Sequence, residues 1–174
     1  MLTDQLRPEG RYLVECFARD GTLRWSEHID NTVMTVGKNL ALDTLLAGSS
    51  YSVTGPYCGF ISSSSYSAIS AADTMSSHAG WLEGGGTNAP TYSGNRKTLA
   101  FNAASGGSKA TSSAASYSIT GTGTVKGVFV VLGTGAVATK DDTNGTLLSA
   151  GLFSGGDKSV SSGDTVTVTY TLSM

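Results

Sequence analysis

Charged residues are scarce in this sequence of 174 residues, at 14%, and 11 lysines and arginines nearly balance 13 aspartates and glutamates. With a formal net charge of −2 and a pI near 5.6, the chain has no basic field to neutralise phosphates, so we expect no nucleic-acid partner. No apolar run approaches the roughly 20 residues of a membrane-spanning helix. Residues 1–10 also lack the apolar core of a signal peptide, which predicts a soluble protein without a membrane partner that is not exported by that route.

Cysteine and histidine are equally rare, with two of each. A pair of cysteines without a secretory signal is usually reduced, so Cys16 and Cys58 are expected to be half-buried thiols. A zinc site needs three or four ligands at characteristic spacing, which Cys16, Cys58, His28 and His78 do not provide. We therefore expect neither a metal site nor a cofactor.

Motifs typical of enzymes are also missing. Asp73, His78 and one of the many serines could be drawn as a hydrolase triad, but no Gly-x-Ser-x-Gly segment surrounds a serine. Residues 141–145 contain acidic and amide oxygens before a glycine, as half of a calcium loop does, yet no glutamate follows at the twelfth position. Asn144-Gly145 is better explained as a hairpin turn. The sequence predicts no catalytic residues and no enzymatic activity.

Small polar residues dominate instead: 23 Gly, 25 Ser and 22 Thr make up 70 of the 174 residues. Threonine, valine and tyrosine suit pleated strands, whereas glycine and serine suit tight turns. Short apolar stretches separated by such turns are typical of a β-sandwich or jelly roll. The sequence therefore predicts a mostly-β fold with strands near residues 57–61, 98–101, 115–119, 125–132, 147–153 and 165–172.

Two of these predicted strands have patterns that indicate which of their faces are buried. Residues 165–172 alternate strictly between threonine and apolar side chains, which predicts one buried and one wet face. Residues 128–132 are apolar on both faces, so this strand should lie in mid-sheet or be covered by the helix, the N-terminal hairpin or another subunit.

The first 50 residues have a different character from the rest. Residues 11–26 predict a β-hairpin around Asp20-Gly21, and a third short strand is expected over 32–36. Leucines spaced at i, i+3 and i+4 then predict the one short α-helix, over residues 38–47. We accordingly divide the chain into residues 1–50, a hairpin plus helix that forms an arm contacting another subunit or protein, and residues 51–174, the β-sandwich domain.

Three segments of the sequence resemble a family of small structural proteins of tailed bacteriophages. These are VECFARDGTLRWSEHIDNTVMTVGKNLALDTLLAG, AADTMSSHAGWLE, and GTVKGVFVV followed by the C-terminal GTLLSAGLFSGGDKSVSSGDTVTVTYTLSM. The middle segment is the most distinctive, and it matches the family at Asp73, Thr74, Met75, His78, Gly80, Trp81 and Glu83. Beyond it Arg96 is kept, but Lys97 replaces a proline and Phe101 is the nearest aromatic residue, so the local loop is expected to differ.

The resemblance implies a non-enzymatic virion component, made in the host cytoplasm and located on the capsid exterior. It implies a capsid decoration or cement protein that binds the major capsid protein and stabilises the head as a dimer or trimer. An alternative is a tail or fibre component that binds a host receptor or polysaccharide. A third reading is a carbohydrate-binding module, whose sugar-binding surface would be formed by Tyr66, Trp81 and Tyr92.

Two sets of residues are singled out by this reading. Trp25, Leu40, Leu42, Leu45 and Leu46 are more apolar than a 50-residue appendage can bury alone, so they are candidates for the capsid or subunit interface. Alternatively, the hairpin and helix close the β domain of their own chain. Asp73, His78 and Trp81 are candidates for a structural motif in which Asp73 caps a short helical turn and the two rings hold it against the sheet.

Overall fold

The computed structural model describes residues 8–46 and 54–174, and about half of the chain is β-strand, which confirms the mostly-β prediction. One helix, α1 (Thr35–Leu46), is found among the described residues. Within this same part of the chain, no helix is long and apolar enough to cross a membrane. The strands are β1 (Glu9–Phe17), β2 (Leu23–Val33), β3 (Tyr57–Ser62), β4 (Glu83–Gly85), β5 (Asn88–Tyr92), β6 (Lys97–Thr98), β7 (Ser108–Ala110), β8 (Ala115–Gly121), β9 (Gly123–Leu132), β10 (Thr146–Leu152), β11 (Lys158–Val160) and β12 (Thr165–Ser173).

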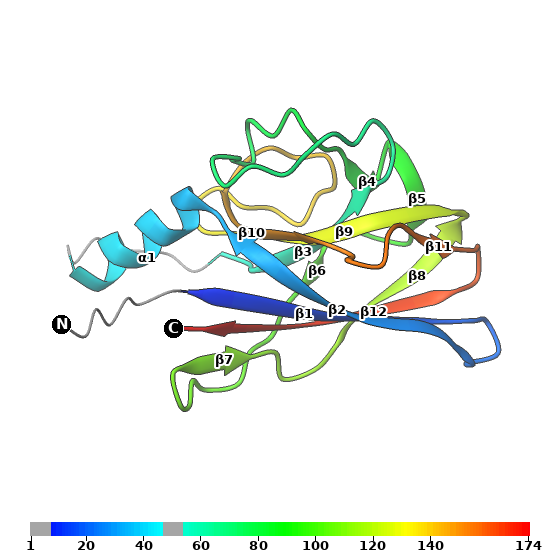
Figure 1. Cartoon of the computed structure of the whole chain (residues 1–174), viewed down its shortest axis with the longest axis horizontal. Helices are drawn as coiled ribbons and strands as arrows, with labels where there is room; N and C mark the ends of the chain where they lie inside the picture. The colour runs from blue at the N-terminus through cyan, green and yellow to red at the C-terminus, as the bar shows by residue number, and fades with distance from the viewer. Residues whose placement is uncertain (1–7, 47–53) are drawn as a thin grey trace.

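The strands form one mixed sheet whose hydrogen-bonded neighbours close into a ring. The path runs β9, β10, β2, β1, β12, β8, β5, β4, β3, and β3 pairs again with β9. Every pairing is antiparallel except β4 with β5. In Figure 1 the paired strands β1, β2 and β12 lie below β3, β9 and β10. Closure leaves few free strand edges, and those of β6, β7 and β11 are short.

The N-terminal hairpin forms as the sequence predicts. The Ala18 N–H donates to the Thr22 carbonyl over 2.8 Å, and Gly21 has the positive φ of 84° that the turn requires. The predicted third strand over 32–36 is wrong. Residues 32 and 33 instead continue β2, because they pair with β10 after β2 leaves β1, and the helix begins directly afterwards at Thr35 rather than at residue 38.

The hairpin shares its sheet with the rest of the chain. All nine residues of β1 pair with β12, and Tyr12, Val14 and Cys16 are fully buried in the core. The expected boundary at residue 50 falls within residues 47–53, outside the described residues. Strand β12 pairs with β1 on one side and with β8 and β7 on the other, so the hairpin and the C-terminal strand belong to the same sheet.

Strand β9 separates two hydrophobic cores. Val128 and Val130 face the cluster inside the ring, whereas Phe129 and Val131 face a second cluster outside it. This confirms that β9 is buried on both faces. The second cluster is covered by the loops that carry Met75, Trp81 and Ala136, and Val36 at the start of α1 also packs against it.

The prediction missed the short strands β4, β5, β7 and β11. Residues 84–89 and 103–114 read as loops because they contain almost no apolar side chains. Within 98–101, β6 includes only Thr98, and Phe101 forms an isolated bridge with Thr111. Asn144-Gly145 lies at the end of a loop over 133–145 rather than in a two-residue turn, because β9 and β10 begin pairing at Leu132 and Thr146.

Candidate protein-binding face

Helix α1 is attached to the β domain by its first turn. The Met34 N–H donates to the Leu148 carbonyl and the Thr35 N–H to the Ala71 carbonyl, each over 2.9 Å. Gly37, the only buried residue of the helix, lies against β10, where an added Cβ would come within 2.9 Å of the Leu148 carbonyl oxygen. A glycine at this position therefore allows the helix backbone to approach the strand.

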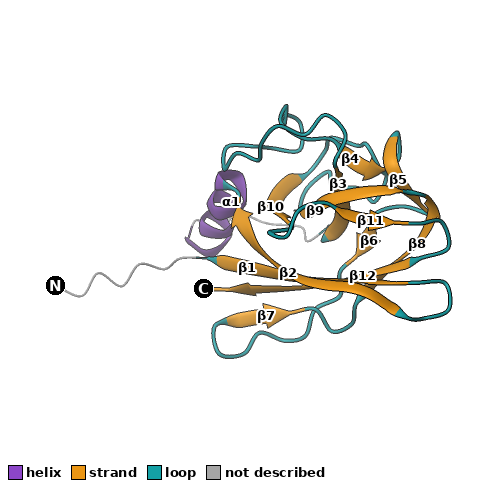
Figure 2. Cartoon of the chain, turned by 45° about the vertical axis from the view of Figure 1, so that its right-hand side comes forward, coloured by secondary structure: helices purple, strands orange, loops and turns teal. Residues whose placement is uncertain are grey.

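The rest of α1 projects away from the sheet, as Figure 2 shows at the side of the molecule where the C-terminus lies. Leu42, Leu45 and Leu46 are 52%, 76% and 78% exposed, and Leu40 is half-buried. The three exposed side chains are together equivalent to about two fully exposed leucines, so burying them would contribute about 3–6 kcal/mol. Scattered exposed leucines are ordinary, but a contiguous patch of this kind marks a binding surface.

An apolar groove of about 680 Å³ runs beside the exposed leucines. Its walls are the helix and the ends of strands β2, β9, β10 and β12. Lys38 is the only charged side chain among the described residues that line it. The lining residues are Pro8, Val33, Gly37, Lys38, Leu40, Ala41, Leu42, Thr44, Leu45, Leu132, Leu148, Leu172 and Met174. We call this groove, together with Leu46, the α1 face.

The structure places four of the five predicted interface residues on the α1 face and Trp25 elsewhere. Trp25 lies eight residues before the end of β2, about 26 Å along the strand from the helix. It packs edge-on against Phe153, with ring centroids 5.4 Å apart, and its Nε1–H donates to the Ser159 carbonyl over 3.1 Å. Trp25 therefore packs against the core of its own chain and is not part of the α1 face.

Asp73, His78 and Trp81 come together as a structural unit. The Trp81 Nε1–H and the Ser70 N–H both donate to Asp73 Oδ2 over 3.0 Å. The rings of His78 and Trp81 stack with centroids 3.9 Å apart, and His78 Nδ1 lies 3.0 Å from the Trp81 carbonyl oxygen. The prediction of a helical turn here is wrong, because Thr74 and Ser77 form a β-bridge around a tight turn. The Asp73 carboxylate therefore accepts a hydrogen bond from the backbone of a non-helical loop.

A buried ion pair joins Glu83 of β4 to Arg96. Arg96 Nε donates to Glu83 Oε1 over 2.9 Å and Nη2 to Oε2 over 2.6 Å, and both residues are at least 95% buried. Arg96 also donates to the carbonyls of Val137 and Asp142, while the Asp141 N–H donates to Glu83. Burial raises the pKa of the Glu83 carboxyl, and the contacts with Arg96 oppose this rise.

Sequence analysis does not identify this pair, although Glu83 ends the segment that carries the resemblance and Arg96 is kept beyond it. Nothing in a separation of 13 residues indicates that two charges meet. The pair joins β4 to the 133–145 loop, which also covers the second core, so its role in the described structure is to hold these loops together.

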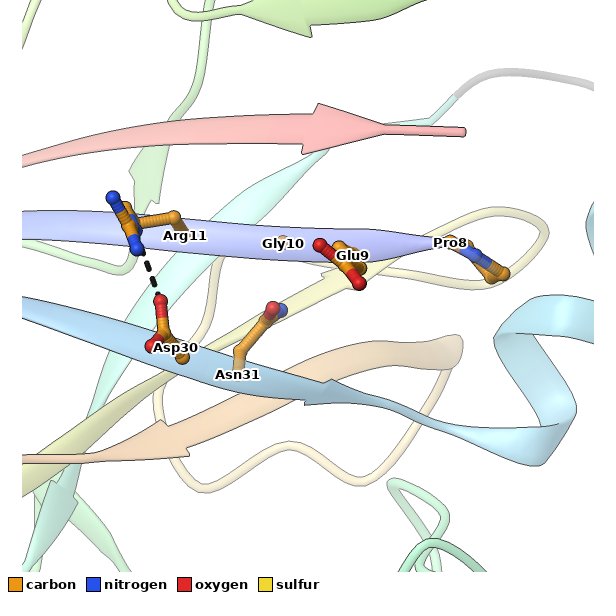
Figure 3. A pocket seen from close by; sticks show the side chains of 6 residues that line it. All are labelled: Pro8, Glu9, Gly10, Arg11, Asp30 and Asn31. Carbon is orange, nitrogen blue, oxygen red and sulfur yellow. Dashed lines mark hydrogen bonds and ion pairs between the residues drawn. The ribbon is translucent and has the colours of Figure 1, made fainter. Parts of the chain in front are cut away.

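A smaller polar hollow of about 350 Å³ lies where β1 begins and β2 ends (Figure 3). Arg11 Nε contacts Asp30 Oδ1 across these strands over 2.9 Å, and both side chains are mostly exposed. Asn31 Nδ2 donates to the Tyr170 hydroxyl over 3.3 Å. An exposed ion pair of this kind contributes little to stability or binding, so the hollow offers a weaker case for a site than the α1 face.

Other residues considered for binding chemistry are buried. Trp81 and Tyr92 are 1% and 2% exposed, so they do not form a sugar-binding surface with Tyr66. Cys16 and Cys58 are free and fully buried rather than half-buried. Across residues 8–46 and 54–174, no group of three acidic, histidine or cysteine side chains is placed to hold a metal ion.

Comparison of the chain with protein-family models, with curated proteins and with solved structures finds no match. The feature that stands out is the α1 face.

Proposed function

We propose that this protein is a bacteriophage capsid decoration, or cement, protein that binds the outer surface of the major capsid protein shell and stabilises the head. The observation that carries the proposal is the α1 face, an exposed apolar ridge beside an apolar groove, which is suited to gripping another protein. The Asp73–Glu83 segment resembles phage virion proteins, and this resemblance is the reason to propose the capsid as the partner.

The scaffold suits a part that adds contacts to a shell. The ring of strands and the two cores make a stiff support, and α1 is tied to it by the Met34 and Thr35 hydrogen bonds. Each added interface of roughly 1,000 Å² raises the free energy needed to open the seam that it covers. At a net charge of −2, many copies can crowd on one surface with little mutual repulsion.

We also propose that the β domain has a sandwich-like or jelly-roll-like architecture. Side chains from strands that are not neighbours in the ring meet across the inner core, which supports a flattened shape. The Tyr117 hydroxyl of β8 donates to the Cys58 carbonyl of β3 over 2.8 Å, although β5 and β4 lie between these strands in the sheet.

Copy number in purified particles tests the function. A cement protein is present in hundreds of copies per virion, whereas a tail or fibre component that binds a host receptor is present in a few to tens. Quantitative mass spectrometry against the major capsid protein distinguishes the two. Hundreds of copies support the proposal, a few copies favour the tail or fibre, and absence from particles overturns both.

A pair of matched variants tests the surface. Leu45→Asp places a charge in the groove, whereas Asn39→Asp places the same charge on an exposed position of the same helix outside the groove. Particles lacking the protein are incubated with each purified variant. Reduced binding of Leu45→Asp with normal binding of Asn39→Asp supports the α1 face, and equal binding of both contradicts it.

A further inference from the structure

Asn144 and Gly145 end the loop over residues 133–145, directly before β10 begins at Thr146. Asn144 is the only one of the six asparagines in the chain that is followed by glycine. It is exposed and lies outside the strands and the helix of the described chain. The function proposed above makes no use of this pair of residues.

The pair has the groups for a reaction within the chain. The side-chain amide of an asparagine can be attacked by the backbone nitrogen of the next residue, and glycine hinders this attack least because it has no Cβ. Gly145 has a φ of 92°, which residues with a side chain rarely adopt. No hydrogen bond to another described residue holds the Gly145 N–H, so the attacking nitrogen is not tied to an acceptor there.

We propose that Asn144 is a site of self-modification, at which the folded protein converts this asparagine into aspartate and isoaspartate with water as the only co-reactant. The Gly145 nitrogen forms a bond to the Asn144 Cγ as the bond from Cγ to Nδ2 breaks, and ammonia leaves with the proton of the Gly145 N–H. Water then opens the five-membered imide. Opening at Cγ gives aspartate, whereas opening at the main-chain carbonyl carbon gives isoaspartate, in which the backbone runs through the side chain. This inference goes beyond the proposed function and does not rest on it.

The product changes the charge of the loop beside Asp142. Asp142 holds Asn144 twice, since Oδ1 accepts from the Asn144 backbone N–H over 2.8 Å and Oδ2 accepts from Nδ2 over 3.2 Å. After conversion to aspartate a carboxylate replaces the amide, so the second hydrogen bond is lost and two like charges meet. The Asp142 carbonyl also accepts a hydrogen bond from Arg96, so the change lies next to a contact that holds the loop. Conversion should therefore loosen the loop over residues 133–145.

Asn102 provides a matched control within the same chain. It is also exposed and outside the strands, but alanine follows it. The methyl group of the next residue hinders the approach of the backbone nitrogen. We therefore expect Asn144 to react at least about tenfold faster than Asn102.

Peptide mapping by mass spectrometry tests the proposal. The full chain is kept folded at mildly alkaline pH and body temperature for several weeks, and samples are digested at acidic pH, which stops the reaction. The peptide that contains Asn144 should gain about 1 Da in ordinary water and about 3 Da in water labelled with oxygen-18. The peptide that contains Asn102 should keep its mass, as should the corresponding peptide of Asn144→Gln.

A folded chain that shows no conversion at Asn144, or equal conversion at Asn102, overturns the proposal. The same incubation in urea separates the folded loop from the bare sequence, and conversion in urea alone also overturns it. The modified fraction is isolated by ion exchange through its added charge. Its amides over residues 133–145 should exchange hydrogen faster than those of the unmodified fraction, and equal exchange contradicts the loosening of the loop.

Discussion

Replacing Arg96 by methionine should destabilise the fold severely, because it leaves the Glu83 carboxylate buried without its counter-charge. Among the described residues, only the Asp141 N–H would still donate to the Glu83 carboxylate, whose side chain is 5% exposed. Breaking a buried pair by removing one partner costs about 3–5 kcal/mol. This is a large part of the 5–15 kcal/mol that stabilises a typical domain.

Urea unfolding measures this cost, and Arg11→Met provides the matched control. Arg11 also contacts a carboxylate at 2.9 Å, but its side chain and that of Asp30 are 61% and 80% exposed. Removing this exposed partner should change the free energy of unfolding by no more than about 0.5 kcal/mol. If Arg96→Met and Arg11→Met cost the same, the buried pair does not organise the loops as we describe.

The cost of Arg96→Met should also depend on pH. Without the guanidinium, burial raises the pKa of Glu83 further above its value in the unfolded chain. The penalty is then complete above the raised pKa and disappears as pH falls towards the unfolded value, where both states are protonated. The stability gap to the parent protein should therefore shrink between pH 7 and about pH 4. A gap that widens on acidification would contradict this reasoning.

Three further perturbations follow from the structure. Gly37→Ala should destabilise by about 1–3 kcal/mol in urea unfolding, because the new Cβ meets the Leu148 carbonyl; an increase in stability would contradict the contact. Burial raises the pKa of Glu27, but hydrogen bonds, first that from Lys158, outweigh burial and lower it. Glu27→Gln should therefore cost stability at neutral pH, and the difference from the parent should shrink as pH falls below about 4 and through the lowered pKa of Glu27; a constant difference across pH would refute this. Deleting residues 1–35 should unfold the remaining chain, as judged by circular dichroism, because β12 loses β1.

Local sequence patterns predict a strand or helix correctly where its own side chains determine its structure. The alternation over residues 165–172 correctly indicated the buried face of β12, and the leucine spacing indicated α1. The start of the helix was misplaced because it depends on the contact of Gly37 with Leu148, which no local pattern records. Strands β4, β5 and β7 pair with β3, β8 and β12, which are distant in sequence, and their own residues carry little signal.

The candidate site was predictable only in part for the same reason. The sequence shows that the helix is more apolar than its own segment can bury, and its leucines are exposed in the structure. The groove beside it was not, because its walls come from Val33, Leu132, Leu148 and Leu172 at the ends of four strands. Trp25 is close to the leucines of α1 in sequence, which is why the sequence predicts one interface for all of them. Trp25 lies near the start of the extended strand β2, however, so it is at the other end of the sheet from α1.

The central claim is that this chain works by covering and gripping other protein. A reconstruction of the purified virion, with the copy number determined in the same particles, tests it most directly. We predict density for the chain on the outside of the capsid in hundreds of copies, with the α1 face against the shell. Particles that contain none of the chain, or that carry it only at the tail, would contradict the account.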